Sequence, residues 1–263
     1  MEEETKVLNP LSYKPIGNLL KSLAIPAIIA NLVNALYNVV DQIFIGQGIG
    51  YLGNAATNIA FPITTMCLAI GLTLGIGGAS NFNLELGKGY PEKSKHTAGT
   101  AASTLIIIGI ILCIVVRIFL EPLMIGFGAT DKILEYSMEY TGITSFGIPF
   151  LLFSIGINPL VRADGNAKYS MIAIVTGAIL NTILDPLFMF VYNWGIAGAA
   201  WATVISQIVS ATLLLIYFPR FKSVKFSLND FIPQLHYLKR IISLGFASFI
   251  YQFSNMIVLV TTN

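Results

Sequence analysis

The stretch TAGTAASTLIIIGIILCIVV, at positions 97–116, contains 20 consecutive residues without a charged side chain. A helix needs roughly 20 mostly apolar residues to cross the hydrocarbon core of a bilayer, which is about 30 Å thick. This stretch therefore predicts a membrane-spanning helix, and similar stretches recur along the chain.

Six segments are long and apolar enough to be membrane spans: 17–46, 54–82, 96–119, 137–161, 169–191 and 196–218. A seventh begins near Leu238 and continues to Asn263. The connections are short and rich in Gly, Pro and Asn, which favour turns over regular helix. The predicted fold class is an all-α membrane protein with six transmembrane helices and part of a seventh.

The composition excludes an ordinary soluble domain. Hydrophobic residues make up 55% of the chain and charged residues 11%, and the mean hydropathy is +0.76. About a quarter of the residues of a soluble domain are charged, because its surface faces water. The net charge of +2 gives no indication of a nucleic-acid partner. Cys67 and Cys113 both lie in apolar runs, which predicts buried thiols rather than a disulfide.

The basic residues predict the orientation of the chain in the membrane. Of the 15 Lys and Arg residues, all except Arg117 and Lys132 fall on one side of the predicted bundle. Arg162 is counted on that side, as part of the connection between the fourth and fifth segments. Lys and Arg concentrate on the cytoplasmic side of membrane proteins. The N-terminus is therefore expected in the cytoplasm.

A weak internal similarity predicts a duplicated architecture. Aligning positions 22–23 with 243–244 also pairs Asn34 with Asn255. Because the first and seventh segments both enter from the cytoplasm, a six-helix unit repeated in the same orientation fits this pattern. The chain is then expected to be one lobe of a protein nearly twice as long.

The expected organisation has four parts. They are a cytoplasmic tail at 1–16, a six-helix lobe at 17–219, a cytoplasmic inter-lobe linker at 220–237 and a truncated seventh transmembrane helix at 238–263.

Two acidic residues stand inside predicted spans, Asp41 in the first and Asp185 in the fifth. A charge within the bilayer costs about 2.5–3.5 kcal/mol on insertion scales, so such residues are usually functional. At 1.5 Å per residue, Asp41, Asp185 and Thr203 of the sixth span lie at a similar depth in the outer half. Asn181 shares a helix face with Asp185. Carboxylate, amide and hydroxyl oxygens suit a hard cation or a shared proton, which predicts a coupling site at Asp41 and Asp185.

Polar residues also follow one face of the first span. Asn31, Asn34, Asn38 and Asp41 recur at i, i+3, i+7 and i+10, as expected for a stripe that faces the bundle interior. Tyr37 lies four residues before Asp41 and is placed to hydrogen-bond its carboxylate. Asn34, Tyr37 and Asn38 are therefore candidate cavity residues. Amides also join membrane helices, at about 0.6 kcal/mol per hydrogen bond, and this structural role is the alternative for each of them.

Pro26 lies inside the first predicted helix, about four turns from Asp41. A proline inside a helix removes one backbone hydrogen bond and favours a kink. The first interpretation is a hinge that bends when the Asp41 carboxylate changes its state. A static kink is the alternative.

The sequence gives little support for an enzyme. It contains no Walker A loop and no nucleotide-binding fingerprint. His96 lies at the boundary between a connection and the third predicted span, and His236 lies in a connection, which argues against a metal-dependent membrane hydrolase. An aspartyl protease needs two close aspartates, usually beside glycine, whereas Asp41 and Asp185 stand in Val-Asp-Gln and Leu-Asp-Pro. We expect no enzymatic activity and no cofactor, apart from Na⁺ or H⁺ as a coupling ion.

Four motifs together resemble the multidrug and toxin extrusion (MATE) family, in its MepA/DinF-like prokaryotic branch. They are PAIIANLVNALYNVVDQIFIG at 26–46, RADGNAK at 162–168, LNTILDP at 180–186 and GIAGAA at 195–200. The resemblance implies an antiporter of twelve helices, with two six-helix lobes facing a central cavity. Such a protein would export cationic and amphipathic compounds in exchange for Na⁺ or H⁺ across the prokaryotic plasma (inner) membrane.

The resemblance also implies roles for individual residues. Asp41, Asn181, Asp185 and Thr203 match the coupling-cation site, with Asp41 and Asp185 as the ligands if the ion is Na⁺. Pro26 matches the proline at which the first helix of the family is proposed to bend. The implied partners are small drugs or toxins, membrane lipids and a second lobe, without which we expect no transport.

Two alternatives remain open from the sequence. A flippase for lipid-linked precursors would share the fold, but it would line its cavity with several basic residues, and the predicted spans carry almost none. A membrane protein that transports nothing would use the same polar residues only to assemble its helices.

Overall fold

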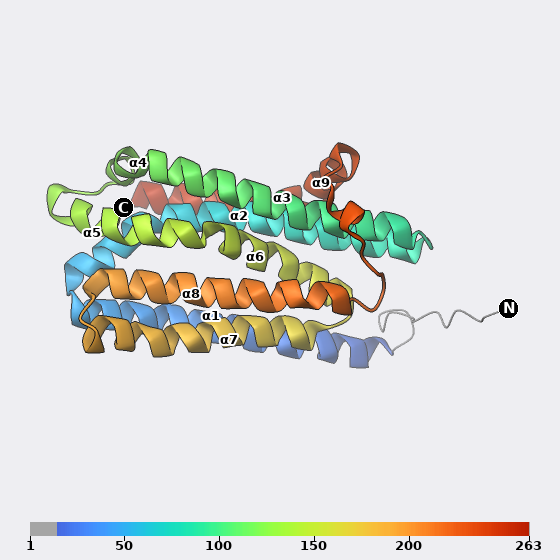
Figure 1. The fold of residues 1–263 in the computed structure, drawn as a ribbon, viewed down its shortest axis with the longest axis horizontal. Coiled ribbons are helices and arrows are strands. Elements are labelled where there is room, and N and C mark those ends of the chain that lie inside the picture. The colour runs from blue at the N-terminus through green and yellow to red at the C-terminus, as the bar shows by residue number, and fades with distance from the viewer. Residues whose placement is uncertain (1–14, 263) are drawn as a thin grey trace.

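The computed structural model describes residues 15–262, so the expected tail at 1–16 lies almost wholly outside them. Six segments of the described chain are long and apolar enough to cross a membrane: Ile16–Gly48, Tyr51–Gly87, Pro91–Ile118, Asp131–Ala163, Ala167–Val191 and Gly195–Arg220. This result confirms the six predicted spans. The spans run side by side along the long axis of the molecule (Figure 1).

Three spans are single helices and three are composite. The single helices are α1 (Ile16–Gly48), α2 (Tyr51–Gly87) and α3 (Pro91–Ile118), and a short helix α4 (Leu120–Gly126) follows them. The composite spans are α5 (Asp131–Thr144) with the 3₁₀ turn η2 (Ser145–Gly147) and α6 (Ile148–Ala163), α7 (Ala167–Pro186) with the π-helix η3 (Leu187–Val191), and α8 (Gly195–Tyr217) with the 3₁₀ turn η4 (Phe218–Arg220). The 3₁₀ turn η5 (Leu228–Phe231) and α9 (Leu235–Thr262) complete the described chain.

Small residues bring the helices of the bundle close together. At Gly75 of α2 a Cβ atom would lie 2.7 Å from the Cα of Gly156 in α6 and 2.5 Å from its carbonyl oxygen. Without a hydrophobic force between helices in lipid, such close backbone contact is a main source of association. Many large apolar side chains point outward instead, among them Ile107, Ile111 and Ile114 of α3. In a membrane protein these side chains face lipid.

The segment after α8 is hydrogen-bonded to a buried carboxylate of the lobe. Asp164, in the turn between α6 and α7, is fully buried. Its oxygens accept hydrogen bonds from the Tyr217 hydroxyl at 2.8 Å and from the backbone N–H groups of Lys222 at 2.9 Å and Ser223 at 2.8 Å. The part of the predicted linker that follows α8 is therefore packed against the lobe at this point.

Removing this carboxylate should destabilise the protein. Asp164→Ala leaves two backbone donors and a hydroxyl unpaired, and each buried unpaired group costs about 1–3 kcal/mol. We expect a melting temperature several degrees lower for the purified Asp164→Ala protein in detergent, and a smaller decrease for Asp164→Asn, which keeps one acceptor oxygen. Equal melting temperatures for Asp164→Ala and the wild type would exclude this role.

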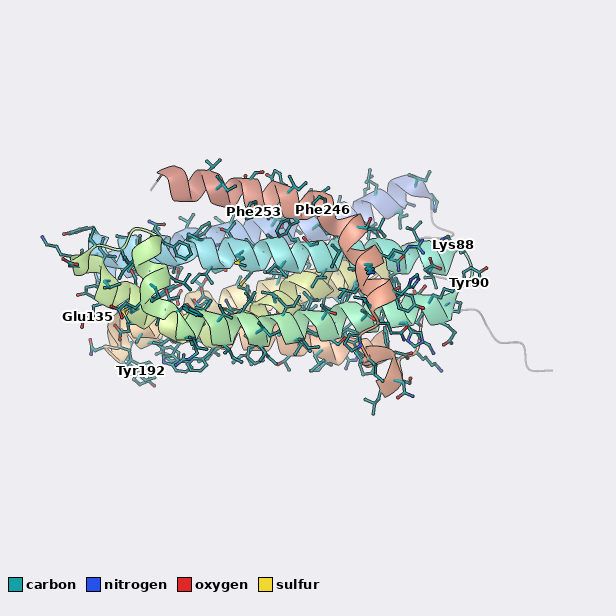
Figure 2. The ribbon with its side chains drawn as sticks, turned by 90° about the horizontal axis from the view of Figure 1, so that it is seen from above. Lys88, Tyr90, Glu135, Tyr192, Phe246 and Phe253 are labelled. Carbon is teal, nitrogen blue, oxygen red and sulfur yellow. The ribbon has the colours of Figure 1, made fainter. Side chains whose placement is uncertain are left out.

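Helix α9 begins at the same end of the bundle as α1 and packs mainly against α2 (Figures 1 and 2). At the crossing, a Cβ atom on Gly77 would lie 2.9 Å from the backbone nitrogen of Gly245. An ion pair of 3.1 Å between Arg240 of α9 and the buried Glu85 of α2 lies nearby along the two helices. Helix α9 begins at Leu235, three residues before the predicted start of the seventh span.

Candidate functional site

Asp41 of α1 and Asp185 of α7 meet inside the bundle. The exposed fraction is 8% for Asp41 and 0% for Asp185. Their side chains lie within hydrogen-bonding reach of each other. Two ionised carboxylates at this separation repel each other, and a shared proton or a cation between them would remove that repulsion. The matched depth predicted from the sequence corresponds to a direct contact.

Asn181 and Thr203 complete a polar cluster next to Asp185. The Asn181 side-chain nitrogen donates to Asp185 Oδ1 at 3.1 Å and to Thr203 Oγ1 at 3.5 Å. Asn181 is placed one helical turn before Asp185, and Thr203 comes from the adjoining α8. The structure thus brings together Asp41, Asn181, Asp185 and Thr203, the four residues that the resemblance implied.

Three oxygens of this cluster have no hydrogen-bond donor in the described part of the chain. They are Asp41 Oδ1, Asp185 Oδ2 and Asn181 Oδ1, and each is buried. A buried acceptor without a donor is costly, and in native structures such atoms are satisfied by an ordered water, an ion, a proton or a ligand. The cluster is therefore rich in acceptors and short of donors, which is the chemistry that attracts a proton or a small cation.

Two tyrosines lie beside the carboxylates. Tyr37, one turn before Asp41 on α1, lies close enough to influence both aspartates electrostatically. Tyr140 of α5 lies close to Thr203 and to both Asp41 and Asp185. Sequence reasoning missed Tyr140, although its position near the start of the fourth predicted span was a usable signal.

The backbone changes its winding immediately after Asp185. Helix α7 ends at Pro186, and the next five residues, Leu187–Val191, form a π-helix. Proline lacks the N–H that would continue the regular hydrogen-bond ladder. Short π-helical segments are rare and frequently occur at functional sites.

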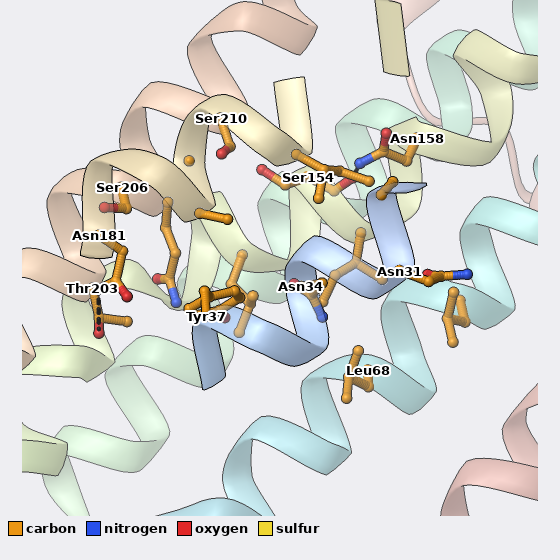
Figure 3. Close-up of a pocket in the computed structure, with 18 of the residues that line it drawn as sticks. Asn31, Asn34, Tyr37, Leu68, Ser154, Asn158, Asn181, Thr203, Ser206 and Ser210 are labelled. Atoms are coloured by element: carbon orange, nitrogen blue, oxygen red, sulfur yellow. Dashed lines mark hydrogen bonds between the residues drawn. The ribbon is translucent and has the colours of Figure 1, made fainter. Parts of the chain in front are cut away.

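A cavity of about 300 Å³ adjoins this cluster. Its wall comes from α1, α2, α6, α7 and α8, and Asn181 and Thr203 lie at one end of it (Figure 3). The lining mixes apolar side chains with amides and hydroxyls: Ala30, Asn31, Asn34, Tyr37, Leu68, Leu72, Leu151, Ser154, Ile155, Asn158, Arg162, Ile174, Gly177, Ala178, Asn181, Thr203, Ser206, Gln207 and Ser210. Asp41 and Asp185 do not line the cavity, but Asn181 and Thr203 belong to both the cavity wall and the carboxylate cluster.

The other predicted residues divide between the cavity and its surroundings. Asn34 and Tyr37 line the cavity. Asn38 does not; it is exposed, and its side-chain nitrogen donates to the carbonyl oxygen of Asn34 at 2.6 Å. Pro26 lies inside α1, which continues through it as one helix.

A metal centre built from several strong ligands does not occur within residues 15–262. No group of three or more His, Cys, Asp or Glu side chains gathers in that range. A cation at Asp41 and Asp185 would therefore be held by two carboxylates together with neutral amide and hydroxyl oxygens.

These features define a polytopic helical bundle with a polar cavity and a buried carboxylate pair, which is the architecture of a membrane transporter. The MatE family model matches residues 26–187. The match covers more than half of the chain, and the chain therefore belongs to the MatE family, which its motifs resemble.

The chain is similar to several multidrug transporters of this family. The multidrug export protein MepA of Staphylococcus haemolyticus is 25% identical over 232 residues, which are 86% of this chain and 50% of that protein. A multidrug resistance transporter of the MATE family, solved in an outward-facing conformation, superimposes with a TM-score of 0.85 at 28% identity over 97% of this chain and 56% of that one.

A MOP superfamily transporter from Pyrococcus furiosus, whose reversed binding-pocket polarity is described as suggesting a different function, gives a TM-score of 0.84 at 28% identity over the same shares. The chain spans about half the length of the curated relatives it matches. The six spans form one lobe of the two-lobe transporter fold.

Proposed function

We propose that the protein, together with a second lobe, is a secondary antiporter that exports small amphipathic molecules in exchange for Na⁺ or H⁺. The observation that carries this proposal is the buried Asp41–Asp185 pair, with unpaired acceptor oxygens, directly beside a cavity. The curated relatives are named multidrug export proteins, and this supports the export of drugs.

Coupling follows from the residues that the two sites share. Binding of a proton or a cation at Asp41 and Asp185 removes the repulsion between the carboxylates. Asn181 forms hydrogen bonds with Asp185 and Thr203, and both Asn181 and Thr203 also line the cavity. A change at the carboxylates therefore alters the cavity wall. A rearrangement of α1 around Pro26 would extend this change along the helix. The ion and the drug then both shift the equilibrium between two conformations of the lobe. Binding of either one therefore changes the affinity of the protein for the other.

The cargo is proposed to be small and amphipathic. A cavity of about 300 Å³ is at the lower end of the range for drug-sized ligands, and its wall offers both apolar surface and hydrogen-bonding groups. A second lobe facing this surface would enlarge the site. Cationic drugs are the first class to test, because the adjoining cluster is acidic.

The orientation and the location are proposed on the distribution of charge. With Lys and Arg concentrated at the end where α1 begins, the N-terminus would face the cytoplasm of a prokaryotic cell, in its plasma membrane. The carboxylate pair then lies in the outer half of the bilayer, on the side from which Na⁺ or H⁺ enters.

The proposal is tested by drug resistance in cells that carry Asp41→Asn in the full-length gene product. Asparagine keeps the size of the side chain but removes the charge, so we expect insertion to be intact and resistance to fall to the level of cells without the transporter. Asp131→Asn is the matched control, because Asp131 is exposed at the start of α5. Normal resistance with Asp41→Asn would refute the proposal, and loss of the protein from the membrane would support a purely structural role.

A further inference from the structure

Arg162 lies at the end of the cavity opposite the carboxylate cluster. It belongs to the last turn of α6, at the end of the fourth span, so its predicted place in the connection between the fourth and fifth spans is wrong. Among the described residues that line the cavity, Arg162 is the only one with a formal charge. Asn158, one turn before Arg162 on α6, lies far from Asn181 and Thr203 in Figure 3.

Arg162 is half-buried and its guanidinium has no hydrogen-bond or ion-pair partner within residues 15–262. The nearest acidic residue in the sequence, Asp164, is already occupied by Tyr217, Lys222 and Ser223. Arg162 is the second-last residue of a span of 33 residues, where a long basic side chain normally reaches water, but here it lines the cavity and leaves its donors free for a ligand. A guanidinium presents five donors that match a carboxylate or a phosphate in a bidentate geometry.

A second unpaired group lies on the same face of α6. Ser154, Asn158 and Arg162 recur at i, i+4 and i+8, and all three line the cavity. Ser154 Oγ is buried and has no partner in the described chain, whereas the Asn158 amide is occupied by the Ser154 carbonyl and the Ser170 hydroxyl. Side chains on a helix lean toward its N-terminus, so Arg162 extends along α6 toward Asn158 and Ser154.

Apolar residues line both of the hollows that Arg162 borders. Leu72 and Ile155 line the same cavity as Arg162. Arg162 also lines a second, more open groove together with Leu23, Ala24 and Ala27 of α1. An amphipathic molecule in either hollow would thus find apolar surface together with a single cation.

We propose that Arg162 forms an anion-binding subsite, which holds the carboxylate or phosphate group of an amphipathic ligand at the inner end of the cavity. This inference rests on the proposed function in that the cavity is taken as a cargo site. It adds that the cargo includes amphipaths with an acidic group, in contrast to the cationic class predicted from the sequence. A small organic acid and a lipid headgroup are the two sources of such an acidic group, since both present the same oxygens to the guanidinium.

The subsite is tested by binding to the purified full-length gene product. The probes are 1-pyrenebutyrate and 1-pyrenebutanol, which share an apolar body and differ in the acidic group, and their dissociation constants are measured by fluorescence. We expect Arg162→Gln to raise the dissociation constant of pyrenebutyrate at least tenfold. The dissociation constant of pyrenebutanol should rise less than twofold. Arg162→Lys keeps the charge but not the paired donors, so it should weaken pyrenebutyrate binding by less than Arg162→Gln does.

Arg220→Gln is the matched control, because Arg220 is exposed at the end of η4 and outside the cavity. It should leave both dissociation constants unchanged. If Arg162→Gln weakens the binding of both probes equally, or leaves the binding of pyrenebutyrate unchanged, the proposed subsite is wrong. Comparing each probe across the variants cancels its partition into detergent, and comparing the two probes within one variant separates the loss of the acidic-group contact from partial unfolding.

A competition experiment identifies the source of the acidic group. Displacement of pyrenebutyrate by lysophosphatidate in the wild type, but not in Arg162→Gln, would support a lipid headgroup. Binding of pyrenebutyrate that depends on Arg162 and resists lysophosphatidate would support a small organic acid. Both probes bind without an ion gradient, so the subsite can fail while ion-driven export persists, and export can fail while the subsite persists.

Discussion

Asp185→Asn is expected to reduce export of a fluorescent drug from loaded cells at least a hundredfold, while the protein remains in the membrane at wild-type levels. The side chain keeps its size and retains an oxygen that can accept from Asn181, so the fold has little reason to change. The variant loses the negative charge that attracts a cation and the group that exchanges a proton. The ion then no longer distinguishes the two conformations, and coupling is lost.

The control for this experiment is again Asp131→Asn, which removes an exposed carboxylate and should export normally. Asn181→Ala is expected to have a smaller effect, because it removes the link to Thr203 but leaves both carboxylates. Export by Asp185→Asn at the wild-type rate would mean that the buried pair is not the coupling site.

Gly77→Leu should reduce export by tenfold or more, through the contact between α2 and α9. Any Cβ atom on Gly77 would meet the backbone of α9 at Ile241 and Gly245, and a backbone cannot rotate away as a side chain can. If α9 begins the second lobe, a larger residue here prevents the two lobes from closing at this end of the bundle. Drug accumulation in vesicles, together with a gel-filtration profile of the purified protein, measures the effect.

Gly87→Leu provides the matched control on the same helix, since nothing lies within 4 Å of a Cβ atom at Gly87. Gly245→Leu should reproduce the defect from the other side, because a Cβ there would lie 3.0 Å from the Cα of Thr73. The double variant should be little worse than either single one, because both remove the same contact. Normal export by both single variants would show that close contact between α2 and α9 is not required for export.

The spans and the carboxylate pair were predictable for simple physical reasons. A bilayer demands long apolar segments, so the six spans follow from hydropathy alone. Asp41 and Asp185 stand out because charges are rare in such segments, and their depth follows from a rise of 1.5 Å per residue. Helix geometry also places Asn181 beside Asp185, as the 3.1 Å hydrogen bond shows.

Features that depend on packing between helices could not be predicted in this way. Tyr140 reaches Thr203 only because α5 lies against α8. Asn38 follows the polar stripe of α1, but the cavity ends before it, and its amide turns back to Asn34. Arg162 was counted with a connection because helix ends are uncertain by a few residues, yet that small difference places a cation in the cavity wall.

The central claim, that Asp41 and Asp185 couple ion flow to export, is tested most directly in inverted membrane vesicles that contain the full-length gene product. Drug accumulation is measured with a Na⁺ gradient alone and with a pH gradient alone, for the wild type, Asp41→Asn and Asp185→Asn. Accumulation driven by one gradient in the wild type and absent from both variants is the predicted result, and it also identifies the ion. Accumulation that persists in both variants, or that neither gradient drives in the wild type, would contradict the claim.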